Sequence, residues 1–172
     1  MLSRNLLWLP VLLALLTTAL PADAKDLRGR FAFGFNNQLS PVTGASIKYT
    51  FPAKEPTVNI AIQGIAGIAL FNARAINDQF FAGFRMLFTF ITEDNLNVYA
   101  GGGAGYAGFD DGSRAIRAQP VVGVEFFFFG IENLGFSTEF GVNIDVGIAP
   151  RSGLDVSTAS GSFAAVGVHY YF

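Results

Sequence analysis

Hydrophobic and polar residues alternate with a period of two along most of residues 25–172. The stretch 134–146 shows the pattern most clearly, because every second residue there is apolar or threonine and the residues between them are small, polar or acidic. Such alternation indicates a β-strand with one apolar face. It recurs in eight segments that we predict to be strands: 28–37, 44–51, 57–69, 79–91, 95–107, 115–128, 134–146 and 162–172. Gly64 and Gly67 blur it within the third segment, where we expect a β-bulge.

The connections between the predicted strands fall into a short set and a long set. Those after the second, fourth and sixth strands are short and polar, and read PAKEPT, TEDN and GIEN. Those after the third, fifth and seventh strands are longer: FNARAINDQ, AGFDDGSRA and residues 147–161. The connection after the first strand, NQLSPVT, is intermediate. An even number of strands of about ten residues, with short turns at one end and longer loops at the other, predicts an all-β, eight-stranded antiparallel up-and-down transmembrane barrel.

The composition indicates which face of this barrel points inward. Charged residues make up only 14% of the chain, whereas soluble domains carry about 25%. A soluble barrel such as a lipocalin would bury the phenylalanine face and expose a surface of mostly Gly, Ala, Ser and Thr, which is poor in charge for contact with water. We therefore expect the opposite arrangement, with Phe, Ile and Val against lipid and the small and charged residues in the lumen. Eight strands enclose an interior just wide enough for side chains, so a wide pore is not expected.

The first segment of the chain has the pattern of a cleaved secretory signal peptide. Residues 1–24 begin with a basic region at Arg4, continue with an apolar run, and end in the small-x-small sequence Ala-Asp-Ala before Lys25. The alternative is an uncleaved membrane anchor, which the short apolar run and Pro21 disfavour. The remaining residues 25–172 would form one domain.

Several classes of function are excluded by composition. The chain has no cysteine, which excludes a disulfide scaffold and a thiolate metal site, and its single histidine excludes a multi-histidine metal site. A formal net charge of −2 provides no basic excess for nucleic acid. The nineteen phenylalanines exclude a low-complexity disordered chain. We expect no cofactor.

The C-terminal sequence VGVHYYF places four apolar or aromatic residues two positions apart: Val166, Val168, Tyr170 and Phe172. It resembles the β-signal by which the barrel assembly machinery recognises bacterial outer-membrane proteins. The alternative is an aromatic residue that simply ends an edge strand. Together with YAGGGAGY (99–106), QPVVGVEF (119–126) and NLGFSTEFGV (133–142), the chain resembles the small OmpA/OmpX-like outer-membrane β-barrel superfamily.

This resemblance implies a location and a set of partners. The protein would be integral to the outer membrane of a Gram-negative bacterium, with both termini periplasmic. It would contact outer-membrane lipid and lipopolysaccharide, and it would meet periplasmic chaperones and the barrel assembly machinery during biogenesis. We expect a monomer.

Six charged residues, three of each sign, are predicted to face the lumen: Lys48, Arg85, Arg117, Glu125, Glu139 and Asp145. Buried charges persist only when they are paired and hydrogen-bonded, so we expect an internal ion-pair network. One interpretation is a gate that opens to small ions. The interpretation that we favour is a structural plug that rigidifies the lumen.

His169 has the same inward parity as Ser137 and Glu139 of a neighbouring strand, which invites comparison with the lipid A deacylases, themselves small barrels. The chain has no His-x-Ser-Asn motif like that of those enzymes, and His169 lies near the periplasmic end rather than at the outer leaflet. We expect no catalysis. The sequence DDGSR (110–114) predicts a solvated turn, since two acids are too few for a Ca²⁺ cage.

Aromatic residues near the strand ends on the apolar face are candidates for two girdles at the membrane interfaces. They are Tyr49, Phe51, Phe90, Tyr106, Phe128, Phe136, Tyr170 and Phe172. The alternative is that phenylalanine is simply abundant. Two functional classes then remain: a structural or interaction barrel without catalysis, which we favour, and a small gated pore or lipid-modifying enzyme.

Overall fold

The computed structural model describes residues 26–52, 59–70, 78–149, 152–158 and 165–172, so the predicted signal peptide lies outside the described residues. Nine strands occur in these residues: β1 (Phe31–Asn36), β2 (Gly44–Thr50), β3 (Asn59–Ala69), β4 (Gln79–Glu93), β5 (Leu96–Phe109), β6 (Arg114–Phe127), β7 (Leu134–Ala149), β8 (Gly153–Thr158) and β9 (Ala165–Tyr171). In the described part of the chain, no helix is both long and apolar enough to cross a membrane.

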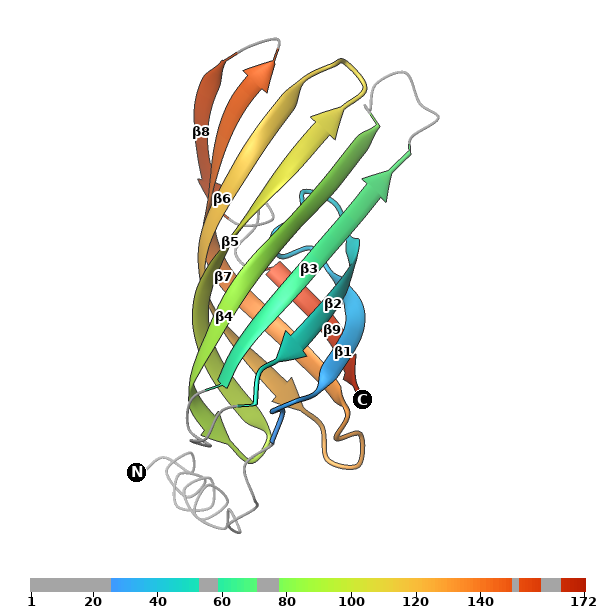
Figure 1. The fold of residues 1–172 in the computed structure, drawn as a ribbon, viewed down its shortest axis with the longest axis vertical. Coiled ribbons are helices and arrows are strands. Elements are labelled where there is room, and N and C mark those ends of the chain that lie inside the picture. The colour runs from blue at the N-terminus through green and yellow to red at the C-terminus, as the bar shows by residue number, and fades with distance from the viewer. Residues whose placement is uncertain (1–25, 53–58, 71–77, 150–151, 159–164) are drawn as a thin grey trace, which may run out of the picture.

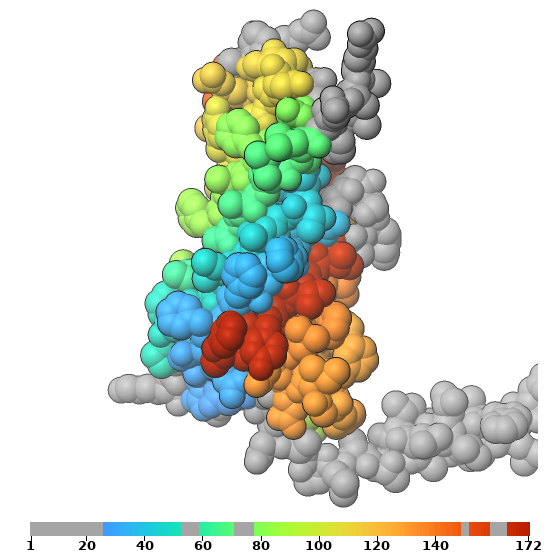
Figure 2. Space-filling model, turned by 90° about the vertical axis from the view of Figure 1, so that its right-hand side faces the viewer, coloured from blue at the N-terminus to red at the C-terminus, as the bar shows by residue number. Residues whose placement is uncertain are grey.

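Eight of these strands close into an antiparallel barrel, as the sequence predicts (Figure 1). Strands β1 to β7 pair in chain order, and β9 joins β7 to β1. The closing pair sets Gly34 of β1 opposite His169 of β9. Figure 2 shows the beginning of the barrel (blue) and its end (red) side by side on one face of the wall. Every predicted strand segment overlaps one of the eight barrel strands, although β4, β5 and β7 continue two or three residues past the predicted ends.

One prediction about the last long loop is wrong. Residues 147–161 were expected to form a loop, but β7 continues to Ala149 and β8 then pairs with residues 142–147 of β7, outside the eight-stranded ring. Only Leu154 and Val156 provide apolar alternation in β8, which is too short a signal to predict a strand. Backbone pairing with β7 holds this strand, since all six of its residues are exposed.

The expected bulge in the third strand is also absent from the structure. The pairing of β3 with β4 keeps one register from Asn59 to Ala69. Gly67 instead allows close packing. A Cβ atom at this position would lie 2.9 Å from a methyl group of Val42 and 3.1 Å from the Ser40 hydroxyl. The glycine therefore leaves space for the β1–β2 connection. The register shifts elsewhere, between residues 89 and 91 where β4 pairs with β5, and near residue 114 where β6 pairs with β7.

The strands differ in length around the barrel. Strands β1, β2 and β9 have six or seven residues, whereas β3 to β7 have eleven to sixteen. Strands β3 to β8 therefore rise beyond the others at one end (Figure 1). We call this the loop end, and the opposite end, which carries the short connections after β2, β4 and β6, the turn end.

The connection between β5 and β6 is shorter than predicted. It spans residues 110–113 rather than the nine-residue AGFDDGSRA, because Ala107 pairs with Ala115 and Gly108 pairs with Arg114, which extends both strands. The expected solvated turn is confirmed: Gly112 has a φ of +80°, and the Ser113 amide donates to an Asp111 carboxylate oxygen at 2.8 Å.

The two faces of the wall have the predicted orientation. Large apolar side chains such as Phe31, Phe84 and Phe140 are exposed on the outside, while Arg85, Glu125 and other polar residues are buried inside. The phenylalanine rows do not form a dry centre. The described interior also contains three small clusters of buried apolar residues, each of four side chains, among the polar groups.

Candidate functional site: the polar interior of the barrel

The six predicted lumen charges form three ion pairs. Lys48 Nζ lies 2.9 Å from a Glu125 oxygen, Arg85 Nη1 lies 2.6 Å from a Glu139 oxygen, and Arg117 Nε lies 2.7 Å from an Asp145 oxygen. The Arg117–Asp145 pair joins neighbouring residues of β6 and β7. The other two pairs join strands that are not neighbours, β2 with β6 and β4 with β7, so they cross the lumen.

Arg85 is the most completely bonded side chain of the interior. Its Nε donates to Gln63 Oε1 at 2.7 Å, and its Nη2 donates to Gln38 Oε1, in addition to the Nη1 contact with Glu139. The second oxygen of Glu139 accepts from the Tyr99 hydroxyl at 2.6 Å. The side chains of the pair are only 1% and 0% exposed. A buried pair of this kind holds its place because every charged atom is hydrogen-bonded.

Glycines on the inner face of the wall provide the space for this pair. A side chain at Gly103 would lie 2.5 Å from Cβ of Arg85, which faces it across the β4–β5 pairing. A side chain at Gly123 would lie 2.6 Å from Cγ of Glu139 and 2.8 Å from the Tyr99 hydroxyl. The glycine-rich stretch of β5 lies within a strand, as predicted, and its glycines leave space in the lumen for long polar side chains.

The Lys48–Glu125 pair lies nearer the turn end and is enclosed by aromatic rings. The Tyr171 hydroxyl donates to Glu125, at 2.8 and 2.9 Å from its two oxygens. Lys48 Nζ lies 5.7 Å from the ring centroid of Tyr99 and 5.5 Å from that of Tyr171, within the range of a cation–π contact. Neither tyrosine was predicted to belong to the ion-pair network, although both have inward parity in their strands.

The connection between β1 and β2 folds into the barrel. Gln38 donates from Nε2 to the Ser137 hydroxyl at 2.8 Å, and its backbone oxygen accepts from Gln119 at 2.7 Å. The backbone oxygen of the next residue, Leu39, accepts from Arg117 at 3.0 Å. The Leu39 side chain is fully buried and packs in the cluster of Ile65, Phe81 and Ala107. The sequence pattern predicts only a connection of intermediate length here, and its two apolar residues, Leu39 and Val42, are too weak a signal to predict that Leu39 is buried.

His169 does not meet the partners considered from the sequence. Its Nε2 lies 2.5 Å from the Ser46 hydroxyl oxygen and 2.9 Å from Gln63 Nε2, whereas Ser137 contacts Gln38 and Glu139 contacts Arg85. The proposed grouping of His169 with Ser137 and Glu139 is therefore not formed.

The hydrogen bonds of Gln63 identify the tautomer of His169. The oxygen of this amide accepts from Arg85, so its NH₂ group faces His169 Nε2, which must then accept. The ring proton lies on Nδ1, an atom with no hydrogen-bond partner. Ser46 and His169 are both buried, and no carboxylate orients the ring, so the pair lacks both the third member and the access that hydrolysis requires.

The outer wall carries the predicted aromatic residues, and most of them contact one another at the turn end. Phe128 lies 5.3 Å from both Phe126 and Phe136 by ring centroids. Further pairs there are Tyr49 with Phe31, Tyr49 with Phe51, and Tyr170 with Phe172. At the loop end, Phe80 lies 5.7 Å from Tyr106.

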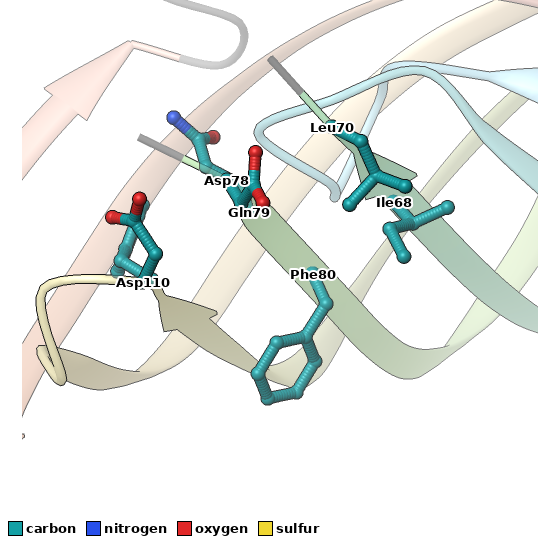
Figure 3. Close-up of a pocket in the computed structure, with 7 residues that line it drawn as sticks. Ile68, Leu70, Asp78, Gln79, Phe80 and Asp110 are labelled. Atoms are coloured by element: carbon teal, nitrogen blue, oxygen red, sulfur yellow. The ribbon is translucent and has the colours of Figure 1, made fainter. Parts of the chain in front are cut away.

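A shallow pocket opens at the loop end (Figure 3). It is lined by Ile68, Leu70, Asp78, Gln79, Phe80, Phe109 and Asp110. The Asp110 amide donates to the Asp78 backbone oxygen at 3.1 Å, which brings two acidic residues to the rim. Across the described residues, no group of three or more histidine, aspartate or glutamate side chains could hold a metal ion.

No family model matches the chain, and no curated protein matches it. The structure places the four residues of the predicted assembly signal, Val166, Val168, Tyr170 and Phe172, on the outer face of the wall beside β1. The resemblance to the OmpA/OmpX-like superfamily therefore stays a prediction that depends on these residues and on the strand pattern.

Proposed function

We propose that the protein is an integral bacterial outer-membrane β-barrel of the small OmpA/OmpX-like type, which acts as a structural or interaction protein without catalysis. The observation that carries this proposal is the inverted wall: charged side chains are buried in three ion pairs inside, and phenylalanine, isoleucine and valine side chains are exposed outside. A water-soluble monomer rarely exposes contiguous apolar surface on this scale.

Backbone pairing supports a membrane location. In hydrocarbon every backbone N–H and C=O group needs a partner within the protein, and a closed ring of strands provides one along the whole wall. The eight-stranded ring meets this requirement over the levels that the short strands β1, β2 and β9 span, since β9 pairs with both β7 and β1. The aromatic contacts at the turn end lie where a membrane interface would meet such a barrel.

The packing of the lumen favours a plug over a pore. Two ion pairs cross the lumen, and the β1–β2 connection inserts Gln38 and Leu39 between them and the loop end. A second candidate, a small gated pore, is favoured only by the fact that two cross-lumen pairs are breakable contacts. Conductance across planar bilayers separates the two: we expect no stable open channel in the native protein, and frequent openings would favour the gate.

Membrane fractionation combined with gel mobility tests the location. We expect the full chain, expressed in a Gram-negative host, to enter the outer-membrane fraction and to change its mobility on boiling. Phe172→Ala should reduce the assembled fraction, whereas Phe129→Ala, which alters another exposed aromatic residue, should not. A chain that remains in the soluble fraction without a mobility change would contradict the proposal.

Lipopolysaccharide incubated with the folded protein and then analysed by mass spectrometry tests the absence of catalysis. We expect an unchanged mass. A mass change that disappears in Ser46→Ala would instead assign an enzymatic function to the Ser46–His169 pair.

A further inference from the structure

Five buried polar atoms without a hydrogen-bond partner gather at the turn end of the barrel interior. They are the hydroxyl oxygens of Thr50 and Thr92, the amide oxygen of Asn59, and both side-chain polar atoms of Asn97. Thr50 ends β2, Asn59 begins β3, Thr92 is the last residue but one of β4, and Asn97 is the second residue of β5. All four residues thus lie where successive strands meet the short turns.

The bulge in β4 aims Thr92 into the barrel. Phe90 and Ile91 are both exposed, at 51% and 43%, although consecutive strand residues normally face opposite sides of a sheet. The register shift between Thr89 and Ile91 restores the inward direction at Thr92, which lies opposite Asn97. The irregularity adds a hydroxyl group to the interior beside an asparagine that already lacks partners.

The ion-pair groups above these atoms have partners, whereas three other buried polar atoms of the described interior, Asn36 Nδ2, Gln119 Oε1 and His169 Nδ1, are scattered singly. Asn97 lies opposite Glu125 in the β5–β6 pairing, and the charge of Glu125 is compensated by Lys48. Farther from the turn end, each side-chain nitrogen of Arg85 and each oxygen of Glu139 has a hydrogen-bond partner. Buried polar groups without partners are costly, and native proteins satisfy them with ordered water or an ion.

The chemistry of the unpartnered atoms identifies water as the ligand. The Asn97 nitrogen only donates, the two asparagine oxygens only accept, and the threonine hydroxyls do both. A bare cation would be repelled by the Asn97 amide hydrogens, and the carboxylate opposite Asn97, that of Glu125, is already paired with Lys48. Water both donates and accepts, and a buried water commonly makes about three hydrogen bonds.

We propose that a cluster of ordered water molecules fills the turn end of the barrel interior, bonded to Thr50, Asn59, Thr92 and Asn97, and that the fully bonded Arg85–Glu139 pair limits this cluster on the side away from the turn end. This inference needs the barrel fold and does not depend on a membrane location.

A pair of cysteine variants tests the boundary, because the chain has no cysteine of its own. Thr50→Cys and Ser46→Cys lie four residues apart on the inner face of β2, and both native side chains are 2% exposed. The Ser46 hydroxyl is bonded to His169 and Gln63, whereas the Thr50 hydroxyl has no hydrogen-bond partner. We expect a small cationic methanethiosulfonate reagent to modify Thr50→Cys about tenfold faster or more, since thiol reactivity follows access to water. Equal rates on barrels that keep their gel mobility shift would overturn the proposal.

A second test uses the protein without substitutions, so it does not depend on whether a variant folds. It measures nuclear Overhauser effects between water and the side-chain amides. We expect contacts from long-lived water to the Asn97 side-chain amide and none to that of Gln63, whose oxygen accepts from Arg85 at 2.7 Å and whose nitrogen donates to Ser46 at 2.9 Å. Their absence at Asn97 would show a dry end. Contacts at both amides would show that water passes the Arg85–Glu139 pair. Either result would overturn the proposal.

Discussion

Phe84 and Arg85 are neighbours in β4 and occupy opposite environments: the phenylalanine is 70% exposed and the arginine is 2% exposed. The same contrast between the outer and inner faces runs around the whole wall. The inner face is held by directional contacts, in which each charged atom needs a particular partner. The outer face carries apolar side chains whose contacts have no direction. Loss of one inner partner should therefore cost more than loss of one outer side chain.

The largest expected effect comes from removing the central inner charge. Arg85→Ala leaves Glu139 buried without its compensating charge, and we expect a loss of about 3–5 kcal/mol in the free energy of unfolding. The urea midpoint of refolding in lipid vesicles measures it. Arg114→Ala, which removes an exposed arginine at the start of β6, serves as the control and should change stability by about 0.5 kcal/mol or less. An unchanged midpoint for Arg85→Ala would contradict the ion-pair network.

Placing a charge on the outer face should have the next largest effect. Phe84→Arg sets a guanidinium on the middle of the outer wall, and in lipid we expect a loss of about 2–4 kcal/mol. Leu154→Arg is the matched control, because Leu154 is 67% exposed but lies in β8, beyond the ends of the short strands. That change should cost about 0–1 kcal/mol in the same vesicles. Equal costs at both positions would argue against a lipid-facing wall.

Removing a neutral inner partner should have a smaller effect. Gln38→Ala deletes the amide that bonds Arg85 and Ser137, and we expect a loss of about 1–3 kcal/mol because buried groups lose their partner. Pro41→Ala in the same connection changes an exposed residue and should shift stability by about 0.5 kcal/mol or less. If the two variants unfold at the same urea concentration, the β1–β2 connection does not brace the lumen.

The smallest effect is expected for the aromatic contacts of the outer face. Phe128→Ala removes two ring contacts at the turn end, which we expect to stabilise the barrel by about 0.5–1.5 kcal/mol beyond simple burial. Phe129→Ala alters the next residue, which is 86% exposed. A larger midpoint shift for Phe128→Ala than for Phe129→Ala supports the aromatic girdle, and identical shifts would indicate that phenylalanine is abundant without a specific arrangement.

Much of this fold could be predicted from local pattern alone. The period of two located all eight barrel strands. One face of these strands carries mostly small residues and few charges, and this composition indicated that it points inward. The pattern failed where its signal is short or has another cause. Strand β8 has only two alternating apolar residues, and Gly67 serves close packing rather than a bulge.

The amino-acid sequence by itself determined which residues share a face, because side-chain direction along a strand follows directly from position. It therefore identified the set of inner charges. Only the tertiary structure decided their partners, since closure and strand stagger set which side chains meet across the lumen: Lys48 with Glu125, and Arg85 with Glu139. Closure also brought Ser46 rather than Ser137 to His169 and drew Gln38 inward. Contacts between distant strands depend on the geometry of the whole ring, which no local pattern contains.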